Sequence, residues 1–171
     1  MDKLALKHIL GRMWRQKEET ATSTPATADA AVLIVDDSRT VLRVFALMLE
    51  REGYLTIPAV DGQQAISLAK RHQPDLILMD IVMPRMNGFE ATRILVNDPE
   101  TKRIPIVMVS GSNLPSDQIW GMRLGAKGFL TKPVSRDALL AKVRAVLAHA
   151  RRAELRSPPL HFPPPSVVPK Y

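Results

Sequence analysis

The 171-residue sequence contains no cysteine, so disulfide bonds and thiolate metal sites are excluded. This composition is compatible with a reducing cytoplasm. Asp, Glu, His and backbone carbonyls remain as candidate metal ligands, a set that favours hard ions such as Mg²⁺.

Long hydrophobic runs are also missing. No apolar segment approaches the roughly 18 to 20 residues of a membrane span, and the N-terminus lacks the apolar core of a signal peptide. We therefore expect an intracellular, soluble protein with a cytoplasmic location.

The net charge of +7 is not concentrated in one part of the chain. Residues 30–150 carry fifteen basic and twelve acidic side chains, residues 1–29 five against four, and residues 151–171 four against one. A nucleic-acid binder usually gathers its basic residues on one face or helix, and only Arg151-Arg152 with Arg156 hints at this. We expect no nucleic-acid partner.

The pattern of residues 31–150 alternates between short apolar runs and amphipathic segments, which predicts five strands each followed by a helix. Such repeats form a parallel sheet with helices on both faces. The runs 32–35 and 76–79 are apolar without alternation and are predicted to be the central strands. The strands are expected at 32–35, 54–58, 75–79, 105–109 and 128–131, and the helices at about 38–52, 62–72, 88–97, 116–124 and 135–150.

Cap and turn residues agree with these boundaries. Ser38 suits the start of the first helix and Asn87-Gly88 the start of the third. Gly53 and Gly125 suit the ends of the first and fourth helices.

Polar side chains follow four of the predicted strands. They are the pair Asp36-Asp37, then Asp80, Ser110 and Lys132. Because the carboxyl ends of parallel strands lie at one edge of a sheet, where ligands bind in open α/β folds, these groups are expected to meet.

Each of these residues alone has an ordinary structural explanation. Asp36 and Asp37 could cap a helix, Asp80 could occupy a turn, Ser110 could be a strand-end hydroxyl and Lys132 a solvated surface lysine. Their joint placement at four strand ends favours a functional site.

Three clustered carboxylates repel one another unless a divalent cation is present. Asp37 and Asp80, with Asp36 acting through water, therefore form a candidate Mg²⁺ site. The Lys132 ammonium and the Ser110 hydroxyl can stabilise the oxygens of a transferring phosphoryl group. Asp80 is the candidate nucleophile, which would form an aspartyl phosphate.

With these residues in place, residues 31–150 resemble the receiver domain of two-component response regulators and are similar to the CheY-like stand-alone proteins. The matching segments are Val35-Asp36-Asp37-Ser38, Leu78-Met79-Asp80-Ile81-Val82-Met83-Pro84, Asn87-Gly88, Ser110-Gly111 and Gly125-Ala126-Lys127-Gly128-Phe129-Leu130-Thr131-Lys132-Pro133.

The resemblance implies a (βα)5 flavodoxin-like α/β fold, doubly wound, with strand order 2-1-3-4-5. It also implies phosphorylation of Asp80 by a sensor histidine kinase, and Mg²⁺ held by Asp36, Asp37, Asp80 and the Val82 backbone carbonyl. A cis peptide bond is implied between Lys132 and Pro133.

The resemblance further implies a switch in which Ser110 moves toward the phosphoryl group and Phe129 rotates inward. The ordinary alternative for Phe129 is a core aromatic. Ile119, Trp120 and Leu124 lie at helical spacing, which favours the core, although Trp120 is also a candidate for a partner-binding face. Faster self-dephosphorylating members of the family tend to carry a polar side chain that orients water two residues after the phosphoacceptor. Because Val82 stands there, the resemblance implies slow autodephosphorylation.

The segments flanking the receiver-like region have separate predictions. Residues 1–19 form a basic amphipathic helix in which residues 3–15 pack on the domain, fray in solvent, or contact a membrane surface or partner. Residues 20–30 are a linker, and residues 151–171 are a Pro-rich tail, either a disordered end or a ligand for an aromatic groove.

The motifs around Asp80, Trp120-Gly121 and Lys132 are similar to those of twitching-motility regulators in type IV pilus chemosensory systems. That resemblance implies a CheA-like kinase and a downstream motility or signalling protein. A phosphate sink, or a phosphorylation-independent scaffold acting through the extensions, is the alternative. A phosphatase of the Asp-nucleophile class is disfavoured because Val82 stands where its acid would be, so we do not expect an enzyme.

Overall fold

The structure, a computed structural model, describes residues 30–112 and 114–156. The helix predicted over residues 1–19 lies outside them, as do the linker except Ala30 and the tail from residue 157. In chain order the elements are β1 (Ala31–Val35), α2 (Arg39–Glu50), β2 (Leu55–Ala59), α3 (Gly62–His72), β3 (Leu76–Asp80), α4 (Gly88–Asn97), β4 (Ile106–Ser110), α5 (Pro115–Arg123), β5 (Gly128–Thr131) and α6 (Arg136–Arg156).

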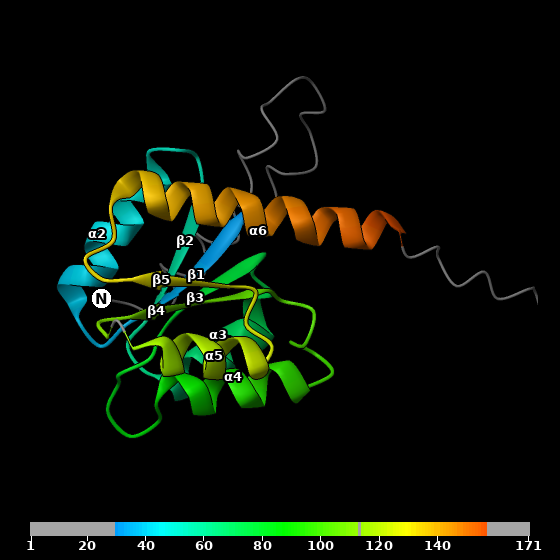
Figure 1. The fold of residues 1–171 in the computed structure, drawn as a ribbon. Helices are drawn as coiled ribbons and strands as arrows, with labels where there is room; N and C mark the ends of the chain where they lie inside the picture. Colours follow the sequence, from blue (N-terminus) through cyan, green and yellow to red (C-terminus); the bar gives the residue numbers. More distant parts are fainter. Residues whose placement is uncertain (1–29, 113, 157–171) are drawn as a thin grey trace, which may run out of the picture.

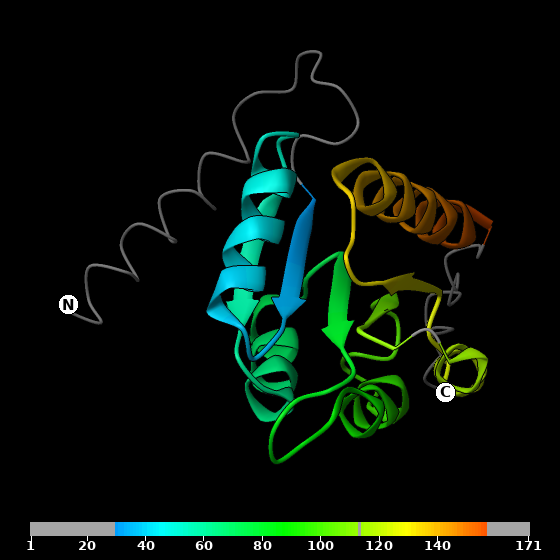
Figure 2. The same cartoon turned by 60° about the vertical axis from the view of Figure 1, so that its left-hand side comes forward.

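The five strands form one parallel sheet in the order β2-β1-β3-β4-β5. Figure 1 shows α2 and α6 on one face of this sheet and α3, α4 and α5 on the other. The predicted fold class, strand order and central position of β1 and β3 are therefore confirmed. The turned view in Figure 2 shows the same division of the helices between the two faces.

Both faces of the sheet are buried because helices cover each of them. Consecutive side chains of a strand point to opposite faces. Val32 and Ile34 of β1 pack toward α2 and α6, whereas Leu33 and Val35 pack toward α3 and α4. All five residues of β1 and of β3 are buried. A strand covered on both sides needs apolar residues at every position, which explains the missing alternation.

The helix boundaries follow the predicted cap residues. The Ser38 hydroxyl accepts a hydrogen bond from the Val41 backbone N–H at 3.4 Å, and Asn87 forms a capping box with Glu90 at the start of α4. Gly53 and Gly125 have positive φ values of 87° and 106° just beyond their helices, a conformation that glycine adopts without steric cost.

The last helix is longer than expected, because α6 continues to Arg156 instead of ending near residue 150. Residues 151–156 consist of Arg, Ala, Glu and Leu, which are all favourable in helices. These residues show no apolar periodicity. The periodicity that places residues in the core therefore stops before the helix does. Figure 1 shows the final turns projecting beyond the sheet.

None of the helices within residues 30–112 and 114–156 is long and apolar enough to cross a membrane.

The turn between β3 and α4 depends on a close backbone approach at Gly88. Its N–H donates a hydrogen bond to the Ile81 carbonyl at 2.9 Å. A Cβ atom at this position would lie 2.0 Å from the Asp80 carbonyl oxygen, which belongs to rigid backbone. The turn that follows Asp80 therefore requires glycine.

We predict that Gly88→Ala lowers the free energy of unfolding by about 3 kcal/mol or more, because the backbone around Asp80 must move to relieve the overlap. Gly111→Ala is the matched control, since a Cβ at Gly111 meets no atom within 4 Å. Its effect should stay within about 0.5 kcal/mol. Urea unfolding of both variants tests this, and equal losses would contradict the steric explanation.

Candidate functional site

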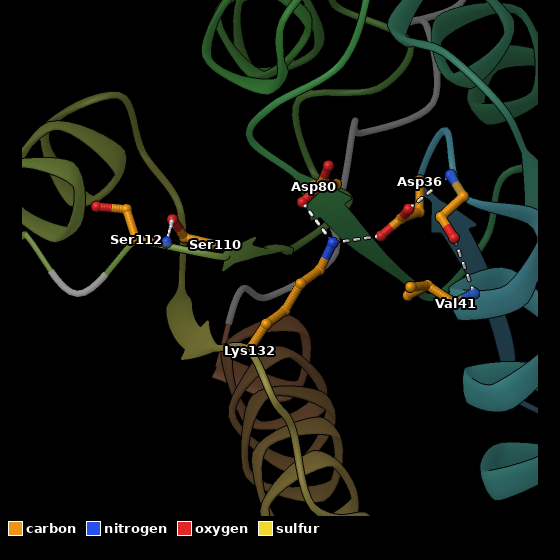
Figure 3. A network of polar contacts seen from close by, with 7 residues as sticks. Asp36, Val41, Asp80, Ser110, Ser112 and Lys132 are labelled. Atoms are coloured by element: carbon orange, nitrogen blue, oxygen red, sulfur yellow. Dashed lines mark hydrogen bonds and ion pairs between the residues drawn. The ribbon is translucent and has the colours of Figure 1, made fainter.

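The four predicted strand ends do meet at one edge of the sheet. Asp36 follows β1, Asp80 ends β3, Ser110 ends β4 and Lys132 follows β5. The register pairs Val35 with Met79, Asp80 with Val109, and Ser110 with Thr131. Asp36 is therefore level with Asp80, while Ser110 and Lys132 lie one and two residues further along the same edge. Figure 3 shows the Lys132 side chain reaching the carboxylates of β1 and β3 across this edge.

The three predicted carboxylates form one cluster. Asp36, Asp37 and Asp80 each offer an oxygen atom within 4.8 Å of the others. Asp36 and Asp80 are only 2% and 4% exposed, whereas Asp37 faces solvent. Three oxygen ligands of this kind, one of them open to water, suit a hard divalent cation.

Asp36 is held from two sides. One oxygen, Oδ1, accepts a hydrogen bond from the Ser38 backbone N–H at 2.8 Å, and Oδ2 accepts one from Lys132 Nζ at 2.6 Å. Because Ser38 caps α2, Asp36 is free of that task and the helix-cap explanation for it is wrong.

Lys132 links the two buried carboxylates, since its Nζ also lies 2.9 Å from Asp80 Oδ1. Its backbone N–H donates to the Ser110 carbonyl at 2.7 Å, which anchors the lysine to β4. Burial alone would lower the pKa of Lys132, but the hydrogen bonds to Asp36 and Asp80 outweigh it and the pKa is raised. The peptide bond to Pro133 is cis, as expected.

Burial raises the pKa of the Asp80 carboxyl above its usual value. The hydrogen bond and charge of Lys132 oppose this increase, and the neighbouring Asp36 and Asp37 charges add to it. Ionised Asp80 is therefore poorly solvated and repelled by its neighbours, and it stands to gain from any cation placed in the cluster.

Ser110 is fully buried, and its Oγ accepts a hydrogen bond from the Ser112 backbone N–H at 2.9 Å. Figure 3 shows this bond on the β4 side of the site, away from the Lys132 bridge. The sequence correctly places Ser110 at the edge, but in this structure its hydroxyl is engaged with the following loop.

Phe129 lies in β5, partly buried against the cluster of apolar side chains under α3 and α4. It is neither a fully buried core aromatic nor a fully exposed one. The Val82 side chain is 72% exposed beside the site.

The prediction that Ile119, Trp120 and Leu124 are core residues is wrong for the first two. Ile119 is 52% and Trp120 58% exposed, and Leu124 is partly buried. Gly121 is the buried position of α5, where a Cβ would already lie 3.1 Å from Met108 Cγ. Because α5 meets the sheet at Gly121, the neighbouring Ile119 and Trp120 lie on the parts of the helix that face away from the sheet.

One feature near the site escaped the sequence analysis. Asp61 caps α3 by accepting from the Gln64 N–H, and it also forms a 2.5 Å ion pair with Arg85. The Gln64 hydrogen bond and then Arg85 lower the pKa of Asp61. Arg85 has a φ of 66° in the loop that carries Val82. The sequence Asp61-Gly62 indicates a helix cap, but nothing in the sequence indicates that Asp61 pairs with Arg85.

Comparison with known proteins agrees with this geometry. Residues 32–144 match the model of the response regulator receiver domain. The chain belongs to this family. It is 46% identical over 119 residues to protein PilH of Pseudomonas aeruginosa, covering 70% of this chain and 98% of that protein.

Solved structures of receiver domains show the same fold. The chemotaxis protein CheY4 of Vibrio cholerae is 34% identical with a TM-score of 0.66, covering 70% of this chain and 99% of that one. The receiver domain of a sensor histidine kinase from Pseudomonas aeruginosa is 30% identical with a TM-score of 0.66, covering 71% and 99%. That structure has a magnesium ion coordinated in its active site cleft.

The raised pKa of Asp80 predicts that the free energy of unfolding depends on pH. A raised carboxyl pKa means that the folded state binds the proton more tightly, so in the absence of divalent ions stability falls as pH rises through that pKa. At pH 7, Asp80→Asn should therefore raise the free energy of unfolding by on the order of 1 kcal/mol.

The gain should shrink as pH falls through the raised pKa of Asp80 toward the ordinary range. Urea unfolding in a chelating buffer between pH 7 and pH 4 measures it. Asp137→Asn, at a 95% exposed side chain outside the cluster, is the control and should show no such trend. A variant that is less stable than the parent at pH 7 would contradict the prediction.

Proposed function

We propose that this receiver domain is a phosphorylation-switched response regulator in which Asp80 receives a phosphoryl group from a sensor histidine kinase. The observation that carries the proposal is the Lys132 ammonium bridging two buried carboxylates, Asp36 and Asp80, beside the exposed Asp37. A lysine in a structural ion pair needs only one carboxylate. Here three carboxylates face one ammonium, and this excess of negative charge is what a phosphoacceptor that uses a bound cation requires.

In the proposed reaction an Asp80 carboxylate oxygen attacks the phosphorus of a phosphohistidine. The O–P bond forms as the P–N bond breaks, and the electron pair and a proton go to the departing imidazole. The Lys132 ammonium, which lies beside Asp80, would then donate a hydrogen bond to a phosphoryl oxygen. Asp36 stays fixed by the Ser38 N–H.

Mg²⁺ is the proposed cofactor, with Asp36, Asp37, Asp80 and the Val82 backbone carbonyl as its ligands. When bound, it supplies positive charge that offsets the negative charge of the phosphoryl group. The residues present fit this ion because their donors are all oxygen and two of them are held in place by burial.

The switch is proposed to run from Ser110 to Phe129. Ser110 would exchange its bond to the Ser112 N–H for one to a phosphoryl oxygen. Phe129, only partly buried in this structure, would turn into the space left behind. The exposed Trp120 and Ile119 on the neighbouring α5 then belong to the surface whose shape depends on this motion.

The similarity to PilH supports a role in type IV pilus or twitching-motility signalling. We propose a CheA-like kinase and a downstream motility or signalling protein as partners, at a cytoplasmic location and without a nucleic-acid partner. The output is carried by contact between proteins and not by an enzymatic activity.

Incubation with Mg²⁺ and acetyl phosphate should add one phosphoryl group, visible by intact-mass spectrometry. Asp80→Asn removes the nucleophile and keeps the shape, so it should show no adduct. Chelation of Mg²⁺ should abolish the adduct of the parent chain. An unmodified parent chain that still binds Mg²⁺ would favour a phosphorylation-independent scaffold, and an adduct on Asp80→Asn would identify another acceptor.

Autodephosphorylation is expected to be slow, because the exposed Val82 side chain offers no hydrogen bond to an attacking water. Val82→Asn should raise the rate of phosphoryl loss by about tenfold, which is less than a positioned general base contributes, because an amide can orient the water but cannot take its proton. Val82→Ala, which removes bulk without adding polarity, is the matched control. An unchanged rate in Val82→Asn, or equal increases in both variants, would contradict this role.

A further inference from the structure

A groove of about 480 Å³, lined by apolar side chains together with Thr131, Ser135 and Lys142, runs between β5 and α6, on the flank of the domain away from β1. Leu130 and Pro133 line one side, and Ala138, Ala141 and Ala145 of α6 line the other. The three alanines are exposed, and their small side chains leave room for a segment of chain to lie along the helix.

The groove lies beside an uncovered edge of the sheet. Within the described residues β5 pairs only with β4, so its other edge is unpaired. Proteins usually shorten such edges or cover them with another segment, because an exposed edge invites pairing with other chains. An occupant of the groove would cover this edge.

The sequence that follows α6 has the composition expected of such an occupant. Residues 157–171 contain six prolines and five apolar residues, Leu160, Phe162, Val167, Val168 and Tyr171, against a single charge at Lys170. Burying this segment would desolvate almost no charge. Proline also restricts the chain in advance, which lowers the entropy lost on docking in a groove.

The lengths of the two segments match. Ala145 and Ala138 lie eleven and eighteen residues before the end of α6, or about 17 and 27 Å along the helix. In an extended polyproline conformation, His161 and Pro165 lie about 16 and 28 Å beyond Arg156. A chain that reverses direction after α6 therefore brings residues 160–165 alongside the alanines of the groove.

Tethering favours this occupant over a second copy of the protein or a separate partner. A segment joined to its site by a few residues has an effective concentration of about a millimolar, well above ordinary concentrations of a free chain. The tail of one molecule would therefore meet the groove of another molecule less often than it meets its own groove.

We propose that residues 157–165 fold back and occupy the groove between β5 and α6, so that the chain covers its own β5 surface. A partner that binds this flank of the domain must then displace the tail. The proposal rests on the groove and the adjoining sequence and does not depend on phosphorylation of Asp80.

The absence of native cysteine makes disulfide formation a clean test in the 171-residue chain. The pair Ala145→Cys with His161→Cys places one thiol in the groove and one in the tail, while Leu160 and Phe162 are kept. With oxidised glutathione at low protein concentration, it should form an intramolecular disulfide at least about fivefold faster than a control pair outside the groove.

The matched control is Arg144→Cys with His161→Cys. Position 144 precedes 145 on the same helix and is about as far from the tail, but it faces the other side, where Arg144 pairs with Glu52. Each single-cysteine variant is first reacted with a small thiol reagent, so that differences in intrinsic reactivity are divided out. Adding Leu160→Ser and Phe162→Ser should reduce the groove pair to the control rate.

Hydrogen exchange provides a second measurement without cysteines. In the 171-residue chain, Leu160→Ser with Phe162→Ser should speed amide exchange in β5 and leave exchange in β1 unchanged. Equal disulfide rates at positions 144 and 145 would overturn the proposal. So would disulfides that form only between molecules, which would assign the groove to a second copy, and so would unchanged exchange in β5.

Discussion

The ammonium of Lys132 sits between the carboxylates of Asp36 and Asp80, and the site depends on this bridge. Lys132 is 96 residues from Asp36 and 52 residues from Asp80 in the chain, so only the folded sheet brings the three together. Two buried carboxylates side by side are unfavourable without a cation. The lysine supplies one positive charge for two negative charges, with Asp37 adding a third. This imbalance would favour the binding of a further cation.

The two-sided core makes that edge possible. Because apolar side chains fill both faces of β1 and β3, the backbone of these strands is fixed and their last residues are aimed at one place. The turn after Asp80 adds a further constraint, since Gly88 lies against the Asp80 carbonyl with no room for a side chain. Core packing and turn geometry thus position the carboxyl group before any ligand is present.

The strand β5 connects the site to the outer surface. It leads into Lys132 at the carboxylate edge, contributes Phe129 to the side facing α5, and forms a wall of the groove beside α6. Through Lys132, β5 therefore joins the carboxylate edge that holds Asp80 to both exposed surfaces. The two surfaces differ in character, because α5 presents the large side chains Ile119 and Trp120, whereas α6 presents alanines.

In the part of the chain that the structure describes, local sequence determined the helices and strands, the central strands and the residues at the strand ends, because apolar periodicity and cap residues act over a few neighbouring positions. The strand order came from resemblance to a known family. Tertiary structure decided what depends on distant partners: the engagement of Ser110 with Ser112, the Asp61–Arg85 pair, and the outward turn of Trp120. Periodicity places Ile119 and Trp120 on a helix but cannot say which side meets the sheet. That choice was made by Gly121, whose missing side chain allows the closest approach to Met108.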